Sequence, residues 1–279
     1  MITRLAGAVL RAILVVLLIA TPALLLPGLS SDVTQIVALV AIFAAALTIF
    51  EYASVYPGLV EFRSAPPFNR LRFISLFSSV FLIAIVIRGE LEPTTLTELV
   101  TNFGIGIGNA IDFPYSPVRQ MVSLLPDGAS FDHVERVRTA AGLSYFISML
   151  TLAVFYFMVR VKNWPINSGP FNVWINMPTF DPTSGGDVVK RLERDARFNI
   201  IVGFTLPFFI PAALKASESM FGPVTLQNPQ SMIWIVSAWA FLPASLLMRG
   251  LAIGRIGEMV ARKRRISARR ERAKAMQLA

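Results

Sequence analysis

The sequence predicts an all-α integral membrane protein, a six-transmembrane-helix bundle with interfacial amphipathic helices and a basic C-terminal cytoplasmic helix. The chain of 279 residues is 54% hydrophobic and only 15% charged, whereas a soluble domain carries about 25% charged residues. Its apolar residues also fall into separate blocks. Each block is about as long as a helix needs to cross roughly 30 Å of hydrocarbon.

The apolar blocks predict membrane-spanning helices at residues 5–26, 36–56, 71–87, 140–161, 198–216 and 232–248. The first block begins with Arg4 and Arg11 and resembles a secretory signal peptide. Its apolar run is long enough to span a bilayer, so we expect a retained helix, and cleavage stays the open alternative. Pro207 and Pro211 predict a bend in the fifth span.

Residues 88–138 form a segment that we expect on the outer surface. A helix is predicted over residues 94–111, with Thr94 or Thr95 as its N-cap. Its apolar residues recur at three- and four-residue steps, which is typical of an amphipathic helix. They are Leu96, Leu99, Val100, Phe103 and Ile107. We expect this helix and residues 118–125 to lie in the interface, with a re-entrant hairpin as the alternative.

Residues 162–197 form the predicted inner loop. It contains tryptophans, prolines and many polar residues. Its latter half, residues 181–197, predicts a surface helix whose first turn is capped near Ser184 or Asp187.

Lysine and arginine are distributed unequally across the predicted membrane. The inner segments hold 21 of them and the outer segments five, while acidic residues divide eight to nine. Because cytoplasmic loops are enriched in lysine and arginine, both termini are predicted to be cytoplasmic, most simply in a bacterial inner membrane. Residues 1–248 then form one transmembrane domain and residues 249–279 a basic tail, which carries +8 of the net charge of +9.

The basic tail predicts contact with the anionic lipids of the inner leaflet. The expected contact residues are Arg262, Lys263, Arg264, Arg265, Arg269 and Arg270. Each cation near such a surface contributes about 1 kcal/mol. A stop-transfer signal without another role is the open alternative. Nucleic acid is not an expected partner, because the excess charge lies in one tail that adjoins a hydrophobic helix.

The side-chain inventory excludes several chemistries. The chain has no cysteine, which excludes disulfides, thiolate metal sites, Fe–S clusters and cysteine nucleophiles. It has a single histidine, His133, which excludes multi-histidine metal centres within this chain. We therefore assign no catalytic residue, no metal ligand and no cofactor from the sequence.

Charged residues within a membrane span are the best indication of transport or proton relay. Arg11, Glu51 and Lys215 are the candidates, and each lies near the end of a predicted helix. Placement at the interface explains such residues without a function. Glu51 lies deepest, and we interpret it as a candidate intramembrane polar site that pairs with Arg11 or Arg72.

Alternate glycines at Gly104, Gly106 and Gly108 could in principle surround a phosphate. No strand precedes them and no Lys-Ser or Lys-Thr follows, so we favour close helix packing or a flexible break. The carboxylates near His133 allow a divalent ion or an acid–base pair. They are Asp112, Asp127, Asp132 and Glu135. We favour a solvated acidic face, with Arg136 and Arg138 as its ion-pair partners.

These observations predict a non-catalytic polytopic membrane protein. We expect an accessory, assembly or structural subunit that packs against another membrane complex or associates with itself. A carrier or channel for a small solute or ion is the alternative. A membrane-embedded lipid-modifying enzyme is the third hypothesis, and it would need clustered carboxylates at one interface.

Overall fold

The computed structural model describes residues 2–28, 30–165, 171–181, 183, 185–222 and 226–278, and this part of the chain is helical without strands. Its helices are α1 (Ile2–Leu25), α2 (Ser31–Ala53), α3 (Phe68–Leu91), α4 (Thr95–Ile111), α5 (Pro117–Val122), α6 (Phe131–Arg160), α7 (Val173–Asn176), α8 (Val188–Ala216), α9 (Glu218–Phe221) and α10 (Pro229–Leu278). Among the described residues, α1, α2, α3, α6, α8 and α10 are long and apolar enough to cross a membrane. The prediction of a helical membrane protein with six candidate spans is confirmed.

The helix starts follow local capping chemistry. The Ser30 hydroxyl accepts a hydrogen bond from the Val33 N–H, and Thr94 forms a capping box with Thr97. Asp187 caps α8 by accepting from the Val189 N–H at 2.9 Å. The predicted alternative cap of α8, Ser184, lies outside the described residues.

The fifth and sixth spans continue as helices well beyond their predicted apolar blocks. The predicted surface helix over residues 181–197 and the fifth span are one helix, α8. The sixth span and the tail are likewise one helix, the 50-residue α10. A helix capped by Asp187 is confirmed in this segment, but its predicted separation from the fifth span was wrong. Hydropathy marks where a helix enters hydrocarbon, whereas no proline or glycine between residues 188 and 202 interrupts the helical hydrogen bonds.

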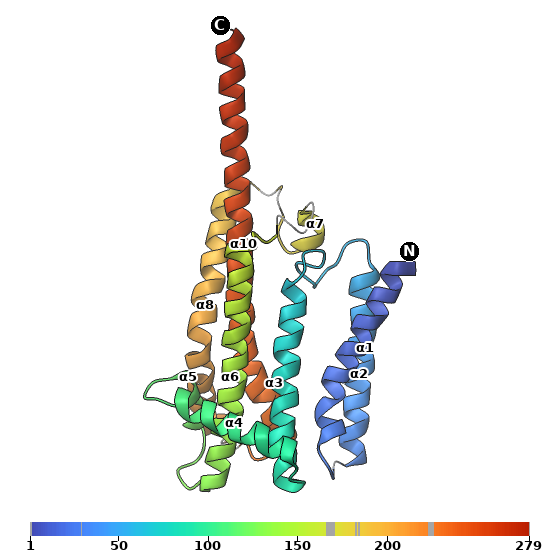
Figure 1. Cartoon of the computed structure of the whole chain (residues 1–279), viewed down its shortest axis with the longest axis vertical. Helices are drawn as coiled ribbons and strands as arrows, with labels where there is room; N and C mark the ends of the chain where they lie inside the picture. The colour runs from blue at the N-terminus through green and yellow to red at the C-terminus, as the bar shows by residue number, and fades with distance from the viewer. Residues whose placement is uncertain are drawn as a thin grey trace.

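The long helices form a four-helix core and a hairpin beside it (Figure 1). The core consists of α3, α6, α8 and α10, and α1 joins the α1–α2 hairpin to it by packing on α3. α2 is the outermost span and buries only Ala41 and Glu51. Both termini lie at the same end, here called the termini end (Figure 1).

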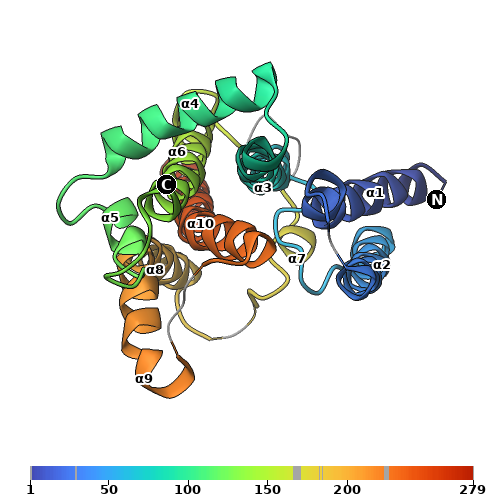
Figure 2. The ribbon, with the colours of Figure 1, turned by 90° about the horizontal axis from the view of Figure 1, so that it is seen from below.

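Helix α4 lies across the opposite end of the bundle, against α6 and α3 (Figure 2). Its predicted apolar stripe faces outward, with Leu96, Leu99 and Phe103 more than half exposed. Gly104 and Gly108 face α6 and are buried. This arrangement favours an interfacial position for α4, which stays a prediction.

The glycines of α4 permit a close approach to α6. A Cβ added at Gly142 of α6 would lie 2.5 Å from the Cα of Gly108, and one added at Gly104 would lie 2.8 Å from Thr139. Gly106, on the other face of α4, has open space around it. Close packing through these glycines, which the sequence favoured over a phosphate cradle, is confirmed.

Both predicted bend residues of the fifth span, Pro207 and Pro211, lie inside α8. Proline lacks the N–H that would bond to the carbonyl four residues earlier, so Pro211 leaves the Pro207 carbonyl without its helical partner. The indole N–H of Trp239 on α10 donates to that oxygen at 3.0 Å. A neighbouring helix thus satisfies the free carbonyl, as such positions in membrane helices require.

A second hydrophobic core lies at the termini end, where the sequence predicted only a polar inner loop. Trp164, Met177 and Phe180 of that loop are buried against the ends of α3, α6, α8 and α10. The indole N–H of Trp164 donates to the Pro66 carbonyl at 3.0 Å. The description of residues 162–197 as a polar loop was therefore wrong in part, because its aromatic residues fold back onto the helix ends.

Candidate functional site

A crevice of about 680 Å³ separates the α1–α2 hairpin from the core. Apolar side chains of α1 and α3 form most of its walls, and Phe241 of α10 contributes from the core. The polar residues that line it come from α1, α2 and α3. They are Arg11, Thr48, Tyr52, Asn69, Arg70 and Arg72. Tyr52 lies in the last turn of α2, and Asn69, Arg70 and Arg72 lie in the first two turns of α3, so this polar part lies toward the termini end.

The arginines of the crevice are not neutralised within the described part of the chain. None of Arg11, Arg70 and Arg72 takes part in an ion pair among the described residues. Arg11 donates to the Gly7 carbonyl at 2.6 Å, and its guanidinium lies 4.6 Å from the centre of the Tyr52 ring. Both contacts orient the side chain without cancelling its charge.

Arg72 lies deeper between the hairpin and the core. Its guanidinium is 5.4 Å from the ring centre of Phe68 and 5.7 Å from that of Phe241. Its Nε atom is buried and forms no hydrogen bond with the described residues. Buried guanidinium nitrogens usually have an acceptor, so this atom indicates unused capacity to bind one.

Glu51, the predicted intramembrane polar site, is buried beside the crevice and only 4% exposed. It does not pair with Arg11 or Arg72. Its carboxylate accepts the backbone N–H groups of Gly58, Leu59 and Val60, at 2.9–3.3 Å. The chain turns back immediately after α2, and this turn brings the three amides within hydrogen-bonding distance of the carboxylate.

The chain around Glu51 fixes one wall of the crevice, because Leu59 and Val60 line it. Arg63 secures the same turn by donating to the carbonyls of Glu51 and Ser54, both at 2.7 Å. Burial lowers the pKa of the Arg63 guanidinium below its ordinary value. Carbonyls at a helix C-terminus are natural acceptors for such a cation.

The other carboxylate near the crevice, Glu61, is already paired. It forms a two-pronged ion pair with Arg249 of α10, with N–O distances of 2.6 and 2.7 Å. Arg249 also donates to the Asn199 amide oxygen of α8 at 3.0 Å. The pair therefore ties the chain after the hairpin to the core, and the Glu61 carboxylate forms no ion pair with a crevice arginine.

The carboxylates near His133 do not form a metal site. Among the described residues, no group of three or more histidine, cysteine or acidic side chains is arranged to hold a metal ion. Asp112 pairs with Arg119 at 2.7 Å and with Arg138 at 2.8 Å. Arg136, expected to serve the same acidic face, instead donates to Glu90 at 2.7 Å.

The tail residues singled out by the sequence begin beside the start of α8, and α10 then extends beyond the other helices (Figure 1). Arg264 pairs with Asp187 at the start of α8, with an N–O distance of 2.7 Å. The hydrogen bond from Arg264 holds the pKa of the Asp187 carboxyl below its ordinary value. The other five are exposed: Arg262, Lys263, Arg265, Arg269 and Arg270.

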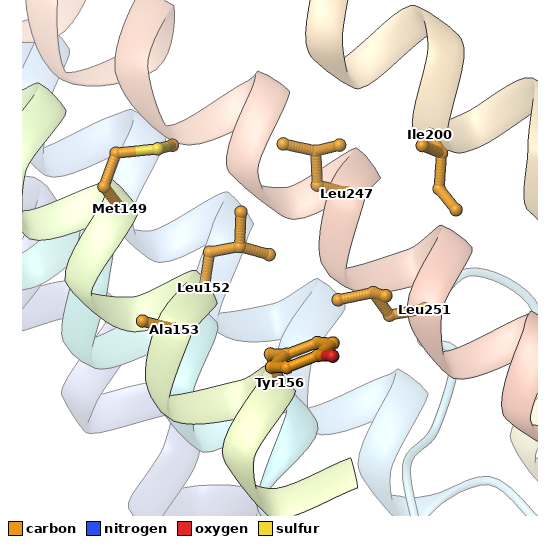
Figure 3. Close-up of a pocket in the computed structure, with 7 residues that line it drawn as sticks. All are labelled: Met149, Leu152, Ala153, Tyr156, Ile200, Leu247 and Leu251. Atoms are coloured by element: carbon orange, nitrogen blue, oxygen red, sulfur yellow. The ribbon is translucent and has the colours of Figure 1, made fainter. Parts of the chain in front are cut away.

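A smaller hollow of about 350 Å³ lies between α6, α8 and α10 (Figure 3). It is lined by Met149, Leu152, Ala153, Tyr156, Ile200, Leu247 and Leu251. Only Tyr156 carries a polar side-chain group. Its lining suits packing against lipid or protein and contains no charged side chain.

Comparison with known protein families, with curated proteins and with solved structures found no match.

Sequence reasoning identified Glu51 but missed the crevice. The sequence offered Arg11 and Arg72 as partners of Glu51, and it did not indicate that they share one space with Arg70. An available signal was that all three lie toward the predicted cytoplasmic side, with Glu51 and Glu61 as the only acidic residues between residues 33 and 89. That local excess of cations required a partner that the sequence could not name.

Proposed function

We propose that the protein is a non-catalytic accessory or assembly subunit of the inner membrane, which binds an acidic cytoplasmic surface of another protein through the end of α10. The observation that carries the proposal is the extension of α10 beyond the rest of the bundle (Figure 1). Among the described residues after Arg264, none forms a side-chain hydrogen bond or ion pair with another helix.

The composition of this extension supports a protein partner. Arg262, Arg265, Arg269 and Arg272 recur at three- and four-residue steps, which puts them on one helical face. Such a face complements a row of carboxylates on a partner.

Distance from the membrane favours a protein over lipid headgroups. Arg249, which pairs with an inner loop, approximates the end of the sixth span. At a rise of 1.5 Å per residue, Arg265 lies about 24 Å beyond it and Arg272 about 34 Å. Electrostatic attraction is screened over about 8 Å at physiological ionic strength. Contact of the whole tail with anionic lipid would therefore require α10 to bend toward the surface.

The experiment is photo-crosslinking from the native membrane, with a photoreactive residue at Ile266, which is 41% exposed. We expect a discrete crosslinked protein and co-migration of that protein in mild detergent. Both should be lost when Arg265, Arg269 and Arg272 are changed to glutamine. Crosslinking to lipid alone, or a complex that survives this triple change, would contradict the proposal.

A matched control removes three exposed cations from the start of α8 instead. Lys190, Arg194 and Arg197 lie at the same end of the bundle and are exposed. Their replacement by glutamine should leave the complex intact. Loss of the complex in both variants would indicate general charge attraction and not recognition by α10.

The cytoplasmic position of α10 can be tested independently, because the chain lacks cysteine. Single cysteines at Asp127 and Ser267 report opposite ends of the bundle. An impermeant maleimide added to intact cells should label the first and reach the second only after permeabilisation. The reverse pattern would invert the proposed orientation.

A carrier for a small anion is a second candidate function, and the arginines of the crevice favour it. Protein-dependent uptake of an anion into liposomes would support a carrier. Absence of uptake in vesicles that contain the folded protein would remove it.

A further inference from the structure

We propose that the crevice between the α1–α2 hairpin and α3 binds one anionic phospholipid from the leaflet at the termini end. The phosphodiester would bind to Arg11, Arg70 and Arg72. The upper part of one acyl chain would pack between the apolar walls of α1 and α3. This inference is independent of the protein partner proposed for α10.

The charge of the crevice selects an anion. Three arginines line one space, and the two nearest carboxylates are used elsewhere, Glu51 by backbone amides and Glu61 by the arginine of α10. Guanidinium groups bind phosphate through parallel N–H···O bonds. The buried Nε of Arg72 is a donor without an acceptor, as a phosphate-binding group should be.

The walls of the crevice select a lipid over a soluble anion. Ten of its sixteen lining residues are apolar. They include Leu10, Leu14 and Leu18 on α1, opposite Phe73 and Leu76 on α3. A hydrophilic anion would leave this surface without a matching partner, whereas an acyl chain covers it.

The position of the charges excludes a zwitterionic lipid as the preferred occupant. A choline or ethanolamine group attached to the same phosphate would bring a cation close to the arginines. Like charges repel strongly where water is partly excluded. Phosphatidylglycerol, whose headgroup ends in hydroxyls, carries no such penalty and has hydroxyls that can bind Tyr52 or Asn69.

Arginines near helix ends also contact bulk lipid without any selectivity. A specific binding site differs from such contacts in two ways. It binds one lipid with saturation, and its affinity depends on the shape of the crevice. The position of the loop over residues 58–60, fixed by the Glu51 carboxylate, supports a specific binding site, since Leu59 and Val60 complete the wall.

The test uses the full chain, purified in a mild neutral detergent and stripped of lipid. Thermal unfolding and native mass spectrometry are recorded with dioleoyl phosphatidylglycerol, dioleoyl phosphatidylcholine or glycerol 3-phosphate. We expect one phosphatidylglycerol to bind with saturation and to raise the unfolding midpoint. Phosphatidylcholine should bind at least roughly tenfold more weakly, as loss of about 1.4 kcal/mol predicts.

Two variants separate charge from shape. Arg70→Gln with Arg72→Gln removes the phosphate donors and should weaken phosphatidylglycerol binding by at least about tenfold. Leu14→Trp fills the apolar part without altering charge and should weaken binding likewise. The controls are Arg88→Gln and Leu24→Trp, which place the same changes at the other ends of α3 and α1, outside the crevice.

The unfolding midpoint of each variant without lipid shows whether it is folded. If the arginine pair does not fold, Leu14→Trp and its control still decide the question. Equal binding of both phospholipids, or unchanged phosphatidylglycerol binding in a folded crevice variant, would overturn the proposal. Equal stabilisation by glycerol 3-phosphate would overturn the lipid and indicate a soluble anion.

Discussion

The close contact between α4 and α6 predicts how much stability is lost when a single Cβ atom is added at Gly142. Replacing Gly142 by alanine would put a Cβ 2.5 Å from the Cα of Gly108 and 2.9 Å from its nitrogen. Favourable carbon–carbon contacts lie at about 3.5–4.0 Å. Because both neighbours are backbone atoms, α4 must move away by about 1 Å or more. Overpacking of this kind costs about 1–3 kcal/mol, so we expect Gly142→Ala to destabilise the protein by about 2 kcal/mol.

Unfolding of the purified protein in mixed micelles, titrated with sodium dodecyl sulfate, measures this free energy. Gly106→Ala is the matched control, because a Cβ at Gly106 meets nothing within 4 Å. Alanine is a better helix former than glycine by about 1 kcal/mol. Gly106→Ala should therefore leave the free energy of unfolding unchanged or raise it. Gly108→Ala should lower it, since its Cβ would lie 3.0 Å from the Arg138 carbonyl oxygen.

Equal free energies of unfolding for the Gly142 and Gly106 variants would refute this reasoning. That result would mean that α4 does not pack on α6 through its glycine face. A stabilised Gly142→Ala would have the same meaning, because only helix propensity would then be measured.

Three further changes test the termini end and α8. Trp239→Phe removes the N–H that donates to the Pro207 carbonyl, and it should lower the free energy of unfolding by about 1 kcal/mol in the same titration. An unchanged free energy of unfolding would mean that the carbonyl has another donor. Glu61→Gln should lower the free energy of unfolding by about 2 kcal/mol. The same change should cost much less in a protein that already carries Arg249→Gln, because the ion pair is then already broken. Equal losses of stability in the two proteins would show that Glu61 and Arg249 are not coupled. The folded pKa of Asp187 is lowered, so its ion pair should persist at its ordinary pKa of about 3.9 and be lost only below it. In a carbon-13 titration, removal of its arginine partner on α10 should raise the pKa of that carboxyl toward its ordinary value, while the Val189 N–H still holds it below that value.

Much of the fold could be predicted because a membrane imposes simple rules. A helix needs about 20 apolar residues to cross hydrocarbon, so the six spans are visible in composition. The caps at Ser30, Thr94 and Asp187 follow from side chains that accept backbone N–H groups. Hydropathy could not predict that α8 and α10 continue past the hydrocarbon, because helical hydrogen bonding is insensitive to that boundary.

The candidate site was less accessible to sequence reasoning. Glu51 was recognisable because a carboxylate inside an apolar block is costly. Its actual partners are backbone amides of residues 58–60, which every residue except proline carries and which no sequence pattern marks. The crevice depends on α1 lying beside α3, and hydropathy does not specify which helices are neighbours. The second core depends similarly on Trp164 folding back onto helix ends.

The crevice lies along the weakest contact of the bundle, which leads to a last prediction. The α1–α2 hairpin reaches the core mainly through α1 on α3, and α2 is almost unburied. A lipid held between hairpin and core would add contacts to both, so its removal should favour local opening there. Opening exposes the connecting chain, where Arg63 is otherwise bound to the end of α2.

Limited trypsin digestion detects that opening. Stripped protein should be cut after Arg63 faster than protein supplied with phosphatidylglycerol, while cleavage in the exposed tail proceeds at the same rate in both. The tail thus controls for trypsin activity within one molecule. Equal cleavage after Arg63 with and without phosphatidylglycerol would show that the hairpin is held by protein contacts alone. Slower cleavage after Arg63 only in the presence of phosphatidylglycerol would mean that a bound lipid supplies part of the packing between the α1–α2 hairpin and the core.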